Sequence, residues 1–150
     1  PVLGFFEIII WLVAIGQDGS WNLVDVQGDQ ALLTTLGTYG ADYTSSGDAY
    51  SIDGVGTYAS VNKTNVSDDV LVRLDPLTGK VEAEIGLLTG YQSIFGIAGF
   101  AGRAYGFDMS GAIVSLDLAT GAVAVEIPAS LGKPWWGAAV STRNPGADPN

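Results

Sequence analysis

The chain has 150 residues, 16 Asp or Glu against 6 Lys or Arg, a net charge of -10, and neither histidine nor cysteine. The two missing residue types exclude a disulfide scaffold, a Cys or His zinc site, a cysteine nucleophile and a Ser-His-Asp triad. The acid excess argues against a nucleic-acid partner, because affinity for phosphates comes largely from Lys and Arg.

The N-terminal segment begins with Pro1 rather than Met, which predicts a processed or excised piece. An apolar stretch, FFEIIIWLVAI, runs from Phe5 to Ile15 and is interrupted by Glu7. It lacks a preceding basic region and is shorter than the ~20 residues that a bilayer crossing needs. Most of its residues are β-branched or aromatic, so we expect a buried strand or strand pair and no membrane span.

A repeat organises the rest of the chain. The segment LVRLDPLTGKVEAEIG, from Leu71 to Gly86, returns 42 residues later as IVSLDLATGAVAVEIP, from Ile113 to Pro128. A degraded copy lies at Trp21 to Gly37. Internal repeats of this length indicate one supersecondary unit per copy. We therefore expect a single domain over residues 1–143 with units at 1–37, 38–86 and 87–128, the first strand of a further unit at 135–141, and a flexible tail at 144–150.

Each unit contains four short apolar runs bounded by Gly, Asp, Ser or Pro, the pattern of antiparallel strands. In the third unit these runs are 94–100, 103–107, 112–116 and 122–127. The fold class is therefore all-β, and four strands every 42 residues predict a β-propeller-like array of about three blades. Propellers typically close with at least four blades. The array is thus a partial ring, an open stack, or a ring completed by a second chain or by pairing of 135–141 with the N-terminal strand.

The repeated Asp-x-x-Thr-Gly has a local structural explanation. The carboxylates of Asp75 and Asp117 can accept hydrogen bonds from backbone N–H groups two or three residues on. Gly79 and Gly121 supply the positive φ that such a turn requires. We therefore interpret all four residues as structural turn residues and not as catalytic ones.

The two repeat segments, RLDPLTGKVEAEI and SLDLATGAVAVEI, resemble the Leu-Asp-x-x-Thr-Gly repeats of quinoprotein-like propellers. The run from Leu12 to Arg143, with GTYASV, IFGIAGFAGRAYGF and WWGAAVSTR, is similar to uncharacterised secreted propeller-like proteins of Gram-negative bacteria. This resemblance implies a propeller fold and an extracytoplasmic location, periplasmic or secreted. It implies no particular activity, because such folds carry many.

Aromatic residues are the candidates for ligand binding. Neighbouring side chains on a strand point to opposite faces, so one of Trp135 and Trp136 can be exposed while the other packs inside. An exposed Trp can stack on a sugar or anchor a protein interface. Tyr105 and Tyr58 are further candidates, with packing between blades as the alternative for all four.

The acidic residues offer two further hypotheses. Asp68 and Asp69 lie in a polar loop that could bind calcium, although the spacing of a calcium-binding loop is missing. Glu82 and Glu84 should share one strand face and, with Glu126, suggest either a paired-carboxylate site or solvated surface charge. Solvated charge is the better interpretation of all three glutamates.

No pattern of nucleophile and base is present in the sequence. It therefore predicts a non-catalytic binding or scaffolding module, with a protein, a glycan, a second copy or the rest of a larger propeller as partner. The alternative is a fragment of a propeller enzyme such as a quinoprotein-type dehydrogenase, which would use pyrroloquinoline quinone and calcium.

Overall fold

The computed structural model of the chain describes residues 12–52, 54–100, 103–129 and 133–139. Over these residues eleven strands form three antiparallel sheets and no α-helix is present, so the predicted all-β class is confirmed. Sheet A contains β1 (Leu12–Ile15), β2 (Ser20–Gln27) and β3 (Gln30–Thr38). Sheet B contains β4 (Tyr43–Ile52), β5 (Gly56–Lys63), β6 (Val70–Leu74) and β7 (Val81–Leu87). Sheet C contains β8 (Ile94–Phe100), β9 (Arg103–Asp108), β10 (Ile113–Leu116) and β11 (Val123–Ile127).

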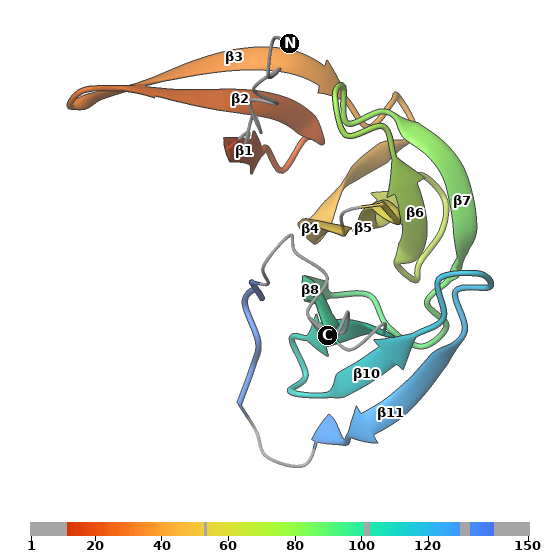
Figure 1. Cartoon of the computed structure of the whole chain (residues 1–150). Coiled ribbons are helices and arrows are strands. Elements are labelled where there is room, and N and C mark those ends of the chain that lie inside the picture. The colour runs from red at the N-terminus through yellow and green to blue at the C-terminus, as the bar shows by residue number, and fades with distance from the viewer. Residues whose placement is uncertain (1–11, 53, 101–102, 130–132, 140–150) are drawn as a thin grey trace, which may run out of the picture.

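Each sheet is a meander in which consecutive strands are neighbours. The three sheets follow one another along an arc, with sheet A at one end and sheet C at the other (Figure 1). Sheets B and C have four strands and sheet A has three. No closed ring is formed over the described residues, because sheets A and C do not meet there.

The core between sheets A and B joins aromatic to aliphatic side chains. Sheet A and the loop after it contribute Trp21 and Tyr39, whose ring centroids lie 6.4 Å apart. Sheet B contributes a buried aliphatic face made of alternating residues, as expected for strands that are covered on that side. The members of this face are Ala59, Val61, Val70, Val72 and Leu74.

The core between sheets B and C follows the same rule. Sheet B turns Tyr50 and Tyr58, a stacked pair with centroids 5.7 Å apart, toward sheet C. Sheet C contributes the aliphatic residues Ile94, Ile97, Ala104, Val114 and Leu116 to this core. Burial of each large aliphatic side chain contributes about 1.5–3 kcal/mol, so the two faces of sheet B together hold the stack in place.

The repeated turn between the last two strands of a sheet docks on the sheet before it. The Asp75 carboxylate accepts hydrogen bonds from Leu77 N at 2.9 Å and Thr78 Oγ1 at 2.8 Å, and Gly79 has a φ of 71°. The Thr78 carbonyl lies so close to Gly37 of β3 that a Cβ there would collide with it. The local motif therefore shapes the turn, and the glycine opposite gives it room.

The same docking recurs one sheet later. Asp117 accepts from Ala119 N at 2.8 Å and from Thr120 N at 2.9 Å. The Thr120 carbonyl then lies against Gly86 of β7, again where a Cβ would collide. Gly37 and Gly86 occupy the same place in the repeat. The repeated sequence therefore corresponds to a repeated contact between neighbouring sheets.

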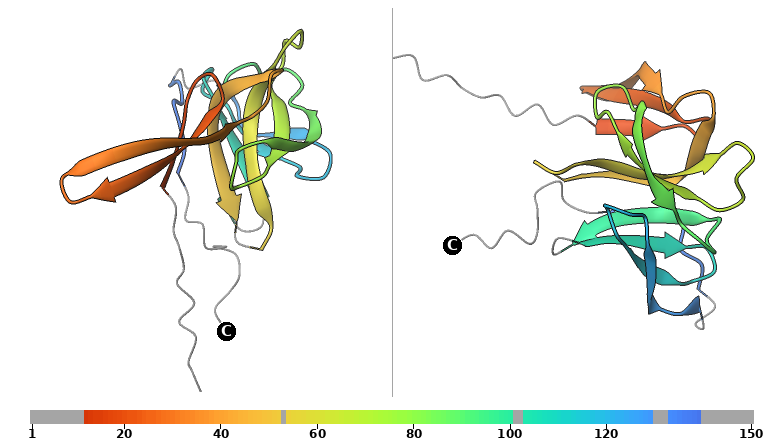
Figure 2. Two further views of the ribbon diagram at one scale, coloured as in Figure 1. Left: turned by 90° about the horizontal axis from the view of Figure 1, so that it is seen from above. Right: turned by 90° about the vertical axis from the view of Figure 1, so that its right-hand side faces the viewer.

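Sheet A ends in a long β2–β3 hairpin that extends away from the rest of the molecule (Figure 2). Its face away from sheet B carries Val26 and Leu33, whose side chains are 62% and 65% exposed. Over the described residues, β3 is thus an edge strand whose exposed apolar side chains lie at this end of the arc.

The ends of the chain are only partly described. Of the apolar stretch from Phe5 to Ile15, residues 12–15 form β1 and residues 5–11 lie outside the described residues. Residues 133–139 have no strand hydrogen bonding, so the strand predicted at 135–141 is absent over its described part. Residues 140–141 and the predicted tail at 144–150 also lie outside the described residues. No helix long and apolar enough to cross a membrane occurs over the described ranges.

Candidate functional site

The outer face of sheet C, away from sheet B, carries a group of aromatic side chains. On sheet B, Tyr58 pairs with Tyr50 across β4 and β5, and both rings are buried against sheet C. On sheet C, Tyr105 pairs with Ala98 across β8 and β9 on the corresponding face. Tyr58 is therefore part of the core, whereas Tyr105 is only half-buried because no further sheet covers it.

Residues 133–139 add two tryptophans to this face. The Trp135 indole packs edge-on against Phe107, with centroids 6.0 Å apart, and its Nε1 donates to the Gly111 carbonyl at 3.1 Å. Trp136 stacks on Phe95 at 5.6 Å, and its side chain is 73% exposed. Trp136 is therefore exposed and Trp135 half-buried, although residues 133–139 do not form the strand whose alternation suggested such a difference.

A half-buried acid fixes this segment to sheet B. Ala138 N donates to Asp48 Oδ2 at 2.7 Å, across 90 residues of sequence. Burial raises the pKa of the Asp48 carboxyl, and the hydrogen bond from Ala138 opposes that rise. Sequence analysis missed Asp48, and no local pattern could have revealed it, because its partner is distant in sequence.

We call Phe95, Phe100, Tyr105, Phe107, Trp135 and Trp136 the aromatic face.

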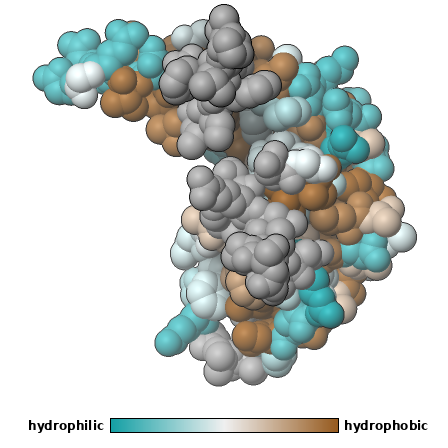
Figure 3. Space-filling view, in the orientation of Figure 1, coloured by the Kyte–Doolittle hydropathy of each residue, from teal (hydrophilic) through white to brown (hydrophobic). Residues whose placement is uncertain are grey.

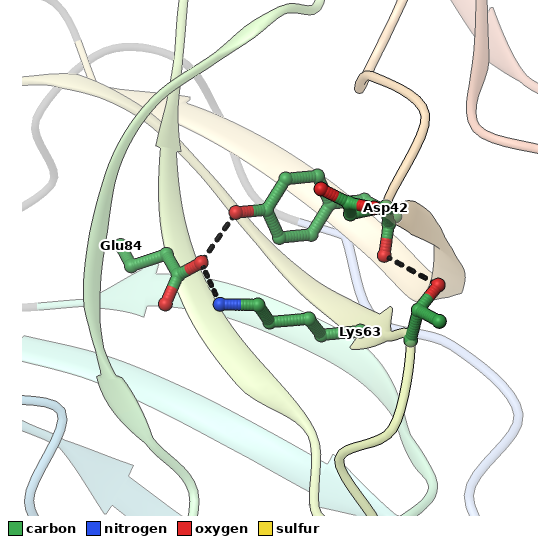
Figure 4. Close-up of polar contacts among 5 residues, drawn as sticks. Asp42, Lys63 and Glu84 are labelled. Carbon is green, nitrogen blue, oxygen red and sulfur yellow. Dashed lines mark hydrogen bonds and ion pairs between the residues drawn. The ribbon is translucent and has the colours of Figure 1, made fainter.

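A cluster of polar side chains also lies on sheet B (Figure 4). Glu84 accepts a hydrogen bond from the Tyr43 hydroxyl and forms an ion pair with Lys63, whose Nζ lies 2.5 Å from Oε1. The bond to Glu84 raises the pKa of Tyr43 to about 12, while Lys63 and Tyr43 lower the pKa of Glu84. Tyr43 therefore stays protonated and Glu84 stays ionised at neutral pH. This cluster ties β4 and β5 to β7 and offers no proton-transfer group.

The two glutamates of β7 do not act together. A register shift in the β6–β7 pairing lies between Arg73 and Leu74, opposite the segment that carries Glu82. Glu82 pairs with Arg73 at 3.5 Å while Glu84 contacts Lys63. The expectation that the two share one face is therefore not met, because the bulge breaks the alternation. The third candidate, Glu126, forms a 4.0 Å pair with Arg103.

The proposed calcium loop separates its two acids. Asp68 accepts from Gly90 N at 2.9 Å and Gln92 Nε2 at 3.3 Å, near the surface. Asp69 is fully buried, and its Oδ2 accepts from Ser46 Oγ and Ile94 N. Burial raises the pKa of Asp69, and its Oδ1 has no partner.

These contacts give the two acids structural roles in the loop between β5 and β6. Over the described residues no three acidic side chains gather around one point where a metal could bind. Both oxygens of Asp68 and Oδ2 of Asp69 accept hydrogen bonds from N–H or O–H donors, whereas Asp69 Oδ1 has no partner. Calcium binding by this loop stays a prediction.

A shallow groove of about 590 Å³ lies between the β1–β2 turn and the ends of β4 and β5. Its lining is wholly polar and consists of Gln17, Asp18, Thr44, Ser45 and Asn62. Sequence analysis did not find it, because three separate segments contribute to it. The groove is open and shallow, so it supports a weaker case for a binding site than the aromatic face.

Comparison with known proteins adds no relative. No protein-family model matches the chain, and the searches of curated proteins and of solved structures found no match. The function is therefore inferred from the geometry of the described residues.

Proposed function

We propose that this chain is a non-catalytic binding or scaffolding module built from propeller-like blades, and that the aromatic face of sheet C is its recognition surface. Two features support the blades: sheets B and C are four-stranded meanders in sequence order, and they stack face to face. The extracytoplasmic location expected from the resemblance belongs to the same proposal.

The observation that carries the proposal is the uncovered aromatic face. Tyr105 has the strand position and direction of Tyr58, yet none of the described sheets packs on it. Beside it Trp136 keeps most of its indole in solvent although Phe95 supports one side of the ring. Exposed Trp and Tyr on a rigid support are the residues that anchor protein interfaces.

A protein partner fits this face better than a glycan. A sugar that stacks on Trp136 also needs free polar groups around the ring. Two polar atoms of this region are already occupied: Asp48 Oδ2 accepts from Ala138 N, and Trp135 Nε1 donates to the Gly111 carbonyl. A partner with an apolar surface loses no hydrogen bonds there, and we therefore propose a protein.

The test is capture of proteins from the source extract on the immobilised chain, with and without Trp136→Ala. Loss of an interface anchor should weaken retention by about 30-fold or more. Leu77→Ala is the matched control, because Leu77 is 59% exposed on the β6–β7 turn and lies outside the aromatic face. Retention that is unchanged by Trp136→Ala, or Trp136-dependent binding to glycans alone, would contradict the proposal. A rise in melting temperature with pyrroloquinoline quinone and calcium would favour the enzyme alternative instead.

A further inference from the structure

We propose that the partner of the aromatic face is sheet A of a second copy of this chain, so that two copies close into one ring of sheets. This inference rests on the proposed function, since it names the partner of the same face. It starts from sheets A and C, which lie at the two ends of the arc in Figure 1.

The first argument is the chemistry of the two internal interfaces. At both, the earlier sheet contributes an aromatic pair, Trp21 with Tyr39 or Tyr50 with Tyr58, and the later sheet contributes an aliphatic face. At the free end, sheet C offers an aromatic face. The partner that continues the rule is therefore a sheet with an aliphatic face on the side that looks toward an earlier sheet.

Sheet A has such a face. The strand pairing places Leu12, Val24 and Leu33 in one row across β1, β2 and β3, with Val26 and Ala31 as the next pair. We call these five residues the aliphatic face. Leu12, Val26 and Leu33 are 58%, 62% and 65% exposed, and over the described strands no charged side chain lies on this side. Figure 3 shows hydrophobic residues of the hairpin directly behind its polar tip.

The repeat confirms that this side faces an earlier sheet. Val24-Asp25 takes the place of Leu74-Asp75, and Leu74 belongs to the face of sheet B that covers sheet A. The side of sheet A that carries Val24 therefore corresponds to the side of sheet B that carries Leu74. In sheet B that side is buried by the preceding sheet, whereas in sheet A it is exposed.

The second argument is the strand count of sheet A. Sheet A has three strands, and its β3 corresponds to β7, because Gly37 and Gly86 receive the same turn. Its β1 thus corresponds to β5, which pairs on both sides, whereas β1 pairs with β2 alone over the described residues. Over the described residues, sheet A thus has no counterpart of β4 and β8.

Residues 135–138 lie where a counterpart of β4 and β8 belongs. β8 crosses β4 so closely that a Cβ on Gly47 would collide with Phe95. Gly137 crosses β8 in the same way, and a Cβ on Gly96 would lie 2.7 Å from the Gly137 carbonyl carbon. Residues 135–138 of one copy and β1–β3 of the second copy therefore supply complementary parts of one four-stranded sheet.

Both copies can make this contact at once. The aromatic face of each would receive the aliphatic face of the other, a head-to-tail contact that closes after two copies. The product contains twice three sheets, a number within the range of closed propellers. Sheets A and C of one copy lie at opposite ends of the arc (Figure 1), so a single copy cannot make the contact with itself.

The experiment is sedimentation of the whole chain at micromolar concentration in about 0.15 M salt, which screens repulsion between the acidic copies beyond about 8 Å. We expect wild type at twice the 15.5 kDa of one chain. Leu33→Asp and Trp136→Asp should each weaken association by at least about 30-fold. Leu77→Asp, at an equally exposed leucine on neither end face, should leave the mass of two copies.

Mixing the two variants tests the head-to-tail geometry. An equimolar mixture of Leu33→Asp and Trp136→Asp keeps one intact pair of faces and should regain association, whereas each variant alone stays single. A wild type that sediments as one copy overturns the inference, as does a mixture that fails to associate or a Trp136→Asp chain that still does. Circular dichroism checks folding, and Val26→Asp with Phe100→Asp provides a second pair of exposed positions.

The two proposals fail in different ways. If the wild type sediments as one copy but still captures another protein through Trp136, the proposal of a second copy is wrong. The proposal that the aromatic face is a recognition surface is then retained. Loss of both self-association and Trp136-dependent capture overturns both.

Discussion

Gly86→Ala tests whether the repeated turn couples one sheet to the next. Gly86 does not have a positive φ, so a surface alanine there would be expected to stabilise the chain by about 0.4–1 kcal/mol through the unfolded state. In the folded chain the added Cβ would collide with the Thr120 carbonyl oxygen and lie 2.9 Å from its carbon and 3.1 Å from Gly121 Cα. Steric conflict and unfolded-state effect therefore have opposite signs.

The conflict should prevail because every atom that it involves belongs to the backbone. No rotamer change can relieve it, and the turn has to move away from sheet B. Overpacking of this kind costs about 1–3 kcal/mol, and the shift also loosens side chains of β11 that pack on the core. We expect a net loss of about 1–2 kcal/mol, which corresponds to a melting temperature lower by about 2–8 °C for a chain of this size.

Thermal unfolding followed by circular dichroism measures the change, and amide hydrogen exchange locates it. Exchange should increase in β7, β10 and β11 and much less in sheet A. Gly28→Ala is the control for backbone strain alone, because Gly28 has a φ of 66° and open space around it. An unchanged or higher melting temperature for Gly86→Ala would refute the docking argument.

Three further results are expected. Gly37→Ala should destabilise the junction of sheets A and B by a similar amount and add to Gly86→Ala in the double variant, because separate contacts are independent. Burial raises the pKa of Asp69, so the folded state holds that proton more tightly than the unfolded chain and loses this stability as pH rises from about 4. The melting temperature of Asp69→Asn relative to wild type should therefore rise between pH 4 and 7, and a constant difference would contradict the reasoning. Glu84→Gln should return the pKa of Tyr43 from about 12 toward its ordinary value in a residue-resolved NMR titration, and no shift would show that Glu84 is not the cause.

The repeat was informative because its signals are local. In the third unit the sequence places strands at 94–100, 103–107, 112–116 and 122–127, and the structure has them at 94–100, 103–108, 113–116 and 123–127. A turn such as Asp117 to Gly121 closes within five residues through its own carboxylate and a glycine of positive φ. Such contacts can be predicted from the residues that make them.

The candidate site was only partly predictable, for the same reason. Trp135, Trp136 and Tyr105 were identified by residue type and do lie on one face, together with Phe95 and Phe107, which the sequence did not single out. Asp48 was missed because its partner lies 90 residues away. The Glu82–Glu84 pair was misplaced because a bulge cannot be seen in a sequence pattern.

By itself the sequence determined the all-β class, the turns and the repeat, because these depend on residues that are neighbours along the chain. Tertiary structure alone decided which faces are buried. Tyr58 and Tyr105 occupy corresponding strand positions, yet sheet C buries the first and the second remains half-exposed. Burial depends on what is packed against a face, and that neighbour comes from a distant part of the chain.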